Sequence, residues 1–202
     1  MTNTNILLSE AIASLFLYNE DMETIDTNTI YLKTKRLIIR PWTKNDFDDF
    51  YAYAKDNVGL SAGWMKINDE ATAHIFLKHF IEDHDTLAII YNNKAIGNIS
   101  IKLLKDKQQC AKIGYVLGKD YWNQGIMTES LKAMIDYCFK ELRLDAIYAE
   151  YLSNNLASAK VLKKCGFKVI KQFNSTLIRL KDEESFMVEL KRENCDYKAI
   201  KL

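Results

Sequence analysis

The sequence is poor in the residues that mark several common classes of protein. It has one proline, Pro41, seven glycines and four cysteines, and no two cysteines form a CxxC pair. Cysteines so few and so far apart do not build a disulfide framework and are usual in a reducing compartment. The three histidines, at 74, 79 and 84, repeat every five residues, which puts no two of them on one helical face. We therefore expect neither disulfide bonds nor a metal site.

An excess of charge of one sign and a long apolar run are also missing. Lys and Arg total 28 against 27 for Asp and Glu, so no overall field attracts nucleic acid or an anionic membrane. No stretch approaches the roughly 20 apolar residues of a transmembrane helix. The first thirty residues are acidic and lack the basic start of a signal peptide. These absences predict a cytoplasmic protein that holds any polyanionic ligand by local contacts.

The length of 202 residues, 48% of them hydrophobic, fits one globular domain with a sizeable core. Apolar residues between Leu7 and Phe16 recur at helical spacing. We predict that residues 1–29 are an N-terminal extension whose helix docks on the domain or on a second subunit of a homodimer. Residues 30–202 are predicted to form the single domain.

Within that domain, hydrophobic periodicity indicates a mixed α/β fold of the α+β class. A strand is expected over 30–40, ended by Pro41, and a capping box of Thr43 and Asp46 should start a helix that reaches residue 57. Asn68 is expected to cap the next helix. Strands are then expected over 86–91, 95–104 and 111–118, the first two joined by a hairpin turn at Asn92 and Asn93.

The strongest helical pattern in the chain begins at Thr128 and continues to Leu142. A crossover through this helix predicts that the strand at 146–152 lies parallel to the strand at 111–118. A last helix should span 156–165 and end at Gly166, in a left-handed position. Two further strands, at 168–173 and 186–192, close the predicted sheet.

The segment YWNQGIMTES, residues 121–130, joins a strand directly to the start of a helix. Backbone N–H groups from Asn123 to Thr128 would then point outward at the positive end of the helix dipole. Such a nest binds phosphate without a strongly basic protein. Gly125 would let the backbone approach the anion closely. The sequence has neither a Walker lysine motif nor GxGxxG, so an ordinary nucleotide site is not indicated.

A second motif follows in NNLASAKVLKKCGF, residues 154–167. The ordered pair of motifs, IGYVLG with YWNQGIMTES and then N-x-x-S-x-x-V-L-x-K-x-G-F, resembles the GNAT superfamily of acetyl-coenzyme A dependent N-acetyltransferases. The opening KTKRLIIRPWTKNDFDDF and the pair Gly63-Trp64 look like its RimJ/RimL branch, the ribosomal-protein N-acetyltransferases. The resemblance covers about residues 32–190. It implies the GNAT fold: a central, mostly antiparallel sheet flanked by helices and splayed between its two central parallel strands.

The resemblance also implies roles for individual residues. Asn155 would hydrogen-bond the pantetheine arm, besides its ordinary reading as a helix cap. Ser158 would lie near the thioester sulfur and protonate the departing thiolate, and Lys164 would lie near the nucleotide phosphates. The backbone of Val116 and Leu117 would pair with the pantetheine. The pyrophosphate loop would comprise Trp122, Asn123, Gln124, Gly125, Ile126, Met127 and Thr128.

The chain departs from the family pattern at three of these positions. Trp122 and Met127 stand where the family has Gln or Arg and Gly or Ala, but backbone amides supply the loop's contacts. Leu162 stands where many members carry a catalytic tyrosine, which excludes tyrosine acid catalysis from that helix. Trp64 and Tyr115 are candidates for the acceptor pocket, although aromatic residues also serve as ordinary core packing.

An amine is mostly protonated at neutral pH, so a base must remove a proton before the nitrogen attacks the thioester. Glu150, near the end of the strand beside the predicted cleft, is the candidate base, and a surface or ion-pair role is its alternative. The acceptor would be a protein N-terminus. The alternatives are a small amine such as a polyamine or an aminoglycoside, which a strongly acidic pocket would favour, and a non-catalytic coenzyme A binding module.

Overall fold

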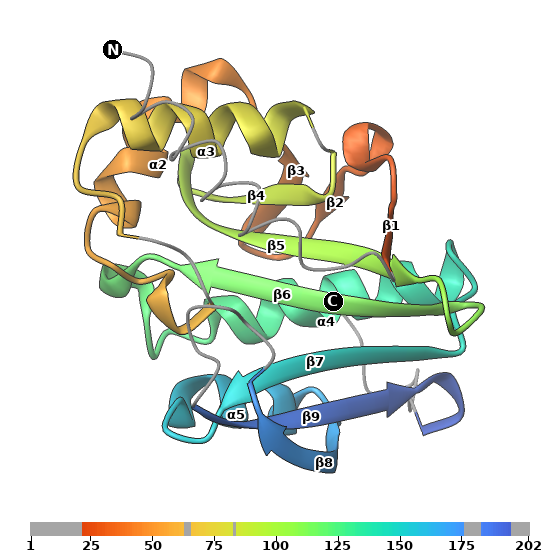
Figure 1. Cartoon of the computed structure of the whole chain (residues 1–202). Coiled ribbons are helices and arrows are strands. Elements are labelled where there is room, and N and C mark those ends of the chain that lie inside the picture. Colours follow the sequence, from red (N-terminus) through yellow and green to blue (C-terminus); the bar gives the residue numbers. More distant parts are fainter. Residues whose placement is uncertain (1–21, 63–65, 83, 176–182, 195–202) are drawn as a thin grey trace.

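The described part of the chain is organised around one nine-stranded sheet (Figure 1). The computed structural model describes residues 22–62, 66–82, 84–175 and 183–194. The strands run in the order β2-β3-β4-β5-β6-β7-β9-β8, and β1 pairs with β5. Their bounds are β1 Met22–Thr24, β2 Leu32–Lys33, β3 Leu37–Pro41, β4 Thr86–Tyr91, β5 Lys94–Leu104, β6 Cys110–Leu117, β7 Ala146–Leu152, β8 Lys168–Asn174 and β9 Glu184–Lys191.

Helices cover both faces of this sheet (Figure 1). The α-helices are α2 Phe47–Ala54, α3 Glu70–Glu82, α4 Ile126–Lys140 and α5 Leu156–Lys164. Alternate residues of each strand face opposite sides, so β4 sends Ala88 and Ile90 to a core shared with α2 and α3. Leu87 and Ile89 point to the other core, which α4 and α5 complete.

The segment predicted as one strand over 30–40 is instead a tight hairpin of β2 and β3, paired Leu32 to Ile39 and Lys33 to Ile38. The Thr34 hydroxyl accepts the backbone N–H of Leu37 at 2.9 Å and that of Arg36 at 3.3 Å. A side chain that bonds its own backbone two or three residues on turns the chain without glycine or proline. Pro41 ends β3, as expected.

The first helical region is shorter than predicted, because α2 ends at Ala54 and not at residue 57. The Thr43 and Asp46 capping box is confirmed, since both the backbone N–H and the hydroxyl of Thr43 donate to Asp46 Oδ2 at 2.8 Å. The cap of α3 was predicted at the wrong residue. Asp69, not Asn68, accepts the backbone N–H of Thr72 at 2.7 Å, which moves the start of the helix by one position.

The later elements agree closely with the sequence. Asn92 and Asn93 have positive φ angles of 49° and 63° and close the β4–β5 hairpin. The last helix ends in a Schellman motif at Gly166, φ 90°, with Phe167 N–H donating to Leu162 O at 3.1 Å. Helix α4 begins at Ile126, two residues before the expected start.

One parallel pair interrupts the antiparallel sheet, as the crossover argument predicted. Strands β6 and β7 pair from Cys110 with Ala146 to Lys112 with Tyr148 and no further. Beyond Lys112 both strands continue without pairing to each other, so they diverge toward their carboxyl ends. The mixed α+β class, the mostly antiparallel sheet and its splay between the central parallel strands are all confirmed.

The predicted helix between residues 7 and 16 lies outside the described residues. The described end of the same extension, residues 22–29, contains β1, which pairs Met22 with Leu104, and a 3-10 turn at Thr27–Thr29. In the part of the chain that the structure describes, no helix combines the length and apolar character needed to cross a membrane.

Candidate active site

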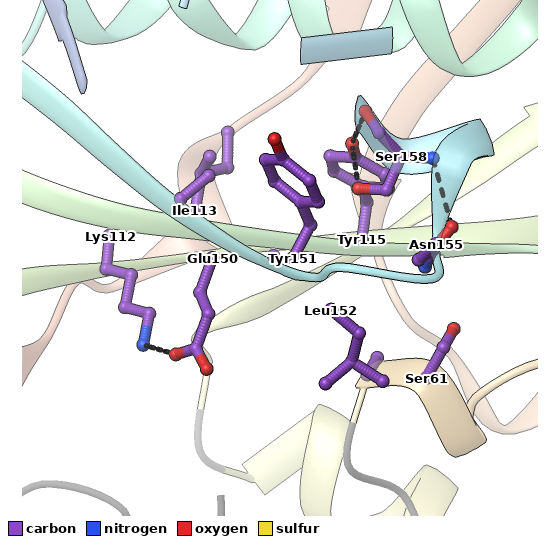
Figure 2. A pocket seen from close by; sticks show the side chains of 12 residues that line it. Ser61, Lys112, Ile113, Tyr115, Glu150, Tyr151, Leu152, Asn155 and Ser158 are labelled. Carbon is purple, nitrogen blue, oxygen red and sulfur yellow. Dashed lines mark hydrogen bonds and ion pairs between the residues drawn. The ribbon is translucent and has the colours of Figure 1, made fainter. Parts of the chain in front are cut away.

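The gap between β6 and β7 holds a cavity of about 150 Å³ (Figure 2). Its walls come from three places: the diverging ends of the two strands, the first turn of α5, and the short 3-10 turn Leu60–Ala62. The residues that line it are Ser61, Ala62, Lys112, Ile113, Gly114, Tyr115, Ala149, Glu150, Tyr151, Leu152, Asn155 and Ser158. Because β7 no longer pairs with β6 here, one edge of β6 faces this space.

The backbone groups that β6 offers to the gap follow from strand alternation. Val116 N–H points toward β5, where it donates to the side-chain oxygen of Asn98 at 3.0 Å. The Val116 N–H, which was predicted to bind the cofactor, therefore already has an acceptor. Leu117 points the opposite way, since its carbonyl accepts the indole N–H of Trp122 at 2.8 Å. The peptide groups of Tyr115 and Leu117, not that of Val116, face the gap.

The loop after β6 forms an anion cradle at the start of α4. Asn123 and Gly125 both have positive φ angles, 60° and 73°, so the chain turns through left-handed conformations before the helix begins. The first helical bond runs from Glu129 N–H to Gly125 O at 3.0 Å. Among the described residues, no acceptor is found for the backbone N–H groups of residues 123–128, which are the usual orphan donors of a helix start.

The side chains of this loop leave the cradle open. Ile126 and Met127 are buried in the core beneath α4, whereas Asn123, Gln124 and Gly125 are exposed. The donors and the helix dipole therefore face outward, which suits the pyrophosphate of coenzyme A. The residues present fit that group, and it would be held mainly by main-chain atoms.

An arginine that sequence reasoning missed braces the cradle from the β2–β3 turn. Arg36 Nη1 donates to Gln124 O at 3.1 Å, and its Nε donates to Glu129 Oε2 at 2.7 Å. Glu129 also accepts from the Thr34 hydroxyl at 2.6 Å. Burial raises the pKa of Glu129, but the hydrogen bonds from Thr34 and Arg36 outweigh it and hold that pKa below its usual value. Glu129 thus connects the β2–β3 turn to the first turn of α4.

The first turn of α5 carries two of the predicted residues. Asn155 is the N-cap, and its side-chain oxygen accepts Ser158 N–H at 3.1 Å. Ser158 Oγ lies 2.8 Å from the hydroxyl of Tyr115, which reaches it from β6 (Figure 2). Burial raises the pKa of Tyr115, so its hydroxyl stays protonated. Tyr115, predicted for the acceptor pocket, does line the cavity, and its polar end meets Ser158.

Glu150 lies across the gap in a network of its own. Its Oε2 is 3.1 Å from Lys112 Nζ, and its Oε1 accepts the Ser175 hydroxyl at 3.0 Å. Only 6% of the Glu150 side chain is exposed, against 22% for Lys112. Glu150 is therefore an ion-pair partner whose two oxygens both have a neighbour, and a proton from an amine could reach it only by a relay or a change of partner.

The polar side chains of the cavity form two sets that lie on opposite sides of the strands, as Figure 2 shows. Tyr115 and Ser158 are on the side of α5, while Glu150, Lys112 and Ser61 are on the other. A thioester placed in the gap would present its sulfur to one group and its carbonyl carbon to an amine arriving from the other. This is the arrangement that direct transfer requires.

Lys164, Leu162 and Trp64 are the other positions that the sequence singled out. Lys164 is exposed in the last turn of α5, and the adjacent Cys165 contacts Thr128 O through its sulfur at 3.8 Å, so this turn lies beside the cradle. Leu162 is buried in the core. Trp64 lies outside the described residues. Among those described, no three His, Cys, Asp or Glu side chains gather as a metal site would require.

Known proteins share this architecture and its sequence pattern. "Probable N-acetyltransferase YjcK" from Bacillus subtilis (strain 168) is 38% identical over 156 residues, which cover 67% of this chain and 82% of that protein. A GNAT-family acetyltransferase from Bacillus anthracis has a TM-score of 0.74 at 22% identity, covering 81% of this chain and 99% of that one. The ribosomal-protein-S5-alanine acetyltransferase from Vibrio fischeri has a TM-score of 0.66 at 22% identity, covering 83% and 98%.

The family described as "Acetyltransferase (GNAT) domain" matches residues 36–168. This span contains the splayed strand pair, the cradle and the first turn of α5. Fold, site geometry and sequence relationship agree: the chain belongs to the GNAT family and is an acetyl-coenzyme A dependent N-acetyltransferase.

Proposed function

We propose that this enzyme acetylates the α-amine of a protein N-terminus, as in the ribosomal-protein branch of its family. The observation that carries the proposal is the charge of the acceptor side of the cavity. Among the described residues that line the cavity, the one acidic side chain is that of Glu150, and it pairs with Lys112 at 3.1 Å. A polyamine or an aminoglycoside carries several positive charges and needs an acidic pocket, whereas an N-terminus brings one. The Vibrio fischeri neighbour, named for acetylation of a ribosomal-protein alanine, supports this choice.

Coenzyme A would lie along β6 with its pyrophosphate in the cradle. Tyr115 and the N–H of Leu117 offer the pantetheine backbone groups that face the gap, in a form of strand addition, while the Leu117 carbonyl keeps its bond from Trp122. The amides of residues 123–128 would bind the phosphates. The side-chain nitrogen of Asn155 would contact the pantetheine while its oxygen caps α5, and Lys164 would approach the nucleotide phosphates from the end of that helix.

The reaction would proceed by direct attack without an acyl-enzyme. The amine loses a proton to an ordered water beside Glu150, and its lone pair forms the C–N bond at the thioester carbon. The C–S bond breaks, the sulfur keeps the electron pair, and Ser158 donates its hydroxyl proton to that sulfur. The acetylated nitrogen releases its second proton to water in the cleft, and water returns a proton to Ser158. Trp64 is proposed to border the incoming acceptor, whereas Tyr115 lines the opposite side of the cavity with Ser158.

A purified-enzyme assay tests the acceptor directly. Release of the free thiol of coenzyme A would be followed with peptides that bear a free N-terminus, with the same peptides blocked at the N-terminus, and with spermidine and an aminoglycoside. We expect turnover with free N-termini only. Turnover with the polycations and none with peptides would replace the proposal by small-amine acetylation, and no release with any amine would indicate a coenzyme A binding module.

A further inference from the structure

Ser158 meets a second hydroxyl that no motif places beside it. The Tyr115 Oη to Ser158 Oγ distance is 2.8 Å, and either atom can be the donor. Tyr115 Oη also lies 3.4 Å from the backbone carbonyl of Ser158. The two residues come from β6 and α5, on the stretch where β6 no longer pairs with β7. The contact therefore forms part of the α5 side of the cleft in which the thioester is proposed to lie.

Ser158 by itself is a poor proton donor. Giving up its proton leaves negative charge on Oγ, and an alkyl hydroxyl bears such charge only at a high cost in free energy. A hydrogen bond donated to Oγ lowers that cost and also fixes the direction of the remaining O–H bond. Leu162 carries no polar atom and is buried in the core, so α5 itself supplies no such donor one turn later.

We propose that Tyr115 is a positioning residue for the acetyl transfer: its phenol donates a hydrogen bond to Ser158 Oγ and turns the Ser158 proton toward the departing sulfur. Burial of Tyr115 raises the pKa of its hydroxyl, which keeps the phenol in the donating form. Tyr115 itself stays protonated throughout. The proton that reaches the sulfur is that of Ser158, and water replaces it. The inference rests on the proposed role of Ser158 and not on the identity of the amine.

Conservative variants test this role. Tyr115→Phe removes one oxygen and keeps the ring, so the fold should be retained. Loss of one neutral hydrogen bond made in the transition state should lower kcat roughly five- to tenfold. The dissociation constant of acetyl-coenzyme A should change by less than about twofold, because Tyr115 binds the cofactor through its backbone. The matched control is Tyr137→Phe on α4, which removes a part-buried tyrosine hydroxyl away from the cavity and should leave kcat unchanged.

The decisive readout is a double-mutant cycle with Ser158→Ala. If Tyr115 acts through Ser158, adding Tyr115→Phe to Ser158→Ala lowers kcat no further. An equal fall in kcat in both backgrounds would overturn the inference, as would a Tyr115→Phe enzyme with wild-type kcat. Full turnover of Ser158→Ala would instead remove Ser158 from the mechanism. The cycle is run with whichever amine the wild-type enzyme acetylates, so failure of the peptide proposal leaves it interpretable.

Discussion

At the residue scale, the chemistry of the cleft depends on which side-chain atoms already have partners. The sequence predicted the positions of Ser158 and Asn155 at the cavity, through a resemblance to a known family, and the position of Gly125 at the start of α4; their roles stay predictions. The partner of Ser158 could not be predicted, since Tyr115 is 43 residues away and its hydroxyl has no sequence signal. The pairing of Glu150 with Lys112 was likewise hidden, because strand register decides which residues of β6 and β7 meet.

The Lys112 and Glu150 pair should be energetically coupled. Lys112→Met leaves the nearly buried Glu150 carboxylate without its cation, and we expect a loss of about 2 kcal/mol of unfolding free energy, given the partial exposure of Lys112. Lys112→Met with Glu150→Gln should cost less than the sum of the two single changes by about 1 kcal/mol. Urea unfolding measures all three.

The exposed Lys78 and Glu82 pair on α3 provides the control. Its side chains are 71% and 61% exposed, so Lys78→Met should change stability by no more than about 0.5 kcal/mol. Strictly additive losses of unfolding free energy at positions 112 and 150 would contradict the coupling between Lys112 and Glu150.

At the scale of elements, the β2–β3 turn is the feature that the sequence did not predict. Residues 34–36 contain no glycine, proline or asparagine, so the apolar pattern from Ile30 to Arg40 predicts a single strand. The turn is made by the Thr34 hydroxyl, and it is anchored by a carboxylate almost a hundred positions away, Glu129. Helix α4, in contrast, could be predicted because its apolar residues recur at helical spacing and form its buried face.

This turn should influence cofactor binding through Arg36. Arg36→Gln removes the ion pair with Glu129 and the bond from Nη1 to Gln124 O, so the cradle loses its brace. We expect the dissociation constant of acetyl-coenzyme A to rise roughly three- to tenfold, because the loop must then be ordered by the cofactor itself. Calorimetry with acetyl-coenzyme A measures the change.

Lys140→Gln offers a comparison within α4. Lys140 pairs with Asp136 on the same helix, and that pair is remote from the helix start where the cofactor is proposed to bind. Its loss should leave affinity unchanged. An Arg36→Gln enzyme with wild-type affinity would show that the loop holds its conformation without the arginine.

At the scale of the whole molecule, the splay between β6 and β7 opens the cavity that we propose as the active site. The parallel order of the two strands followed from the crossover helix. Their divergence beyond Lys112 was implied only by family resemblance, because residues 113–117 have the same β-forming character as any other strand. The placement of the helix expected between residues 7 and 16, and any dimer that it supports, stays a prediction.

The proposed mechanism requires coenzyme A to bind at the cradle, and titration calorimetry of three proteins measures that binding. Gly125→Ala puts a side chain on a residue with φ 73° at the proposed anion site. The control is Gln109→Ala, at an exposed residue that also has a left-handed backbone, φ 57°, in the turn before β6 and so at the opposite end of that strand from the cradle. The wild-type enzyme should bind acetyl-coenzyme A at one site, Gly125→Ala roughly tenfold more weakly and Gln109→Ala with unchanged affinity. No heat with the wild-type enzyme, or equal affinities for the wild type and Gly125→Ala, would contradict the account.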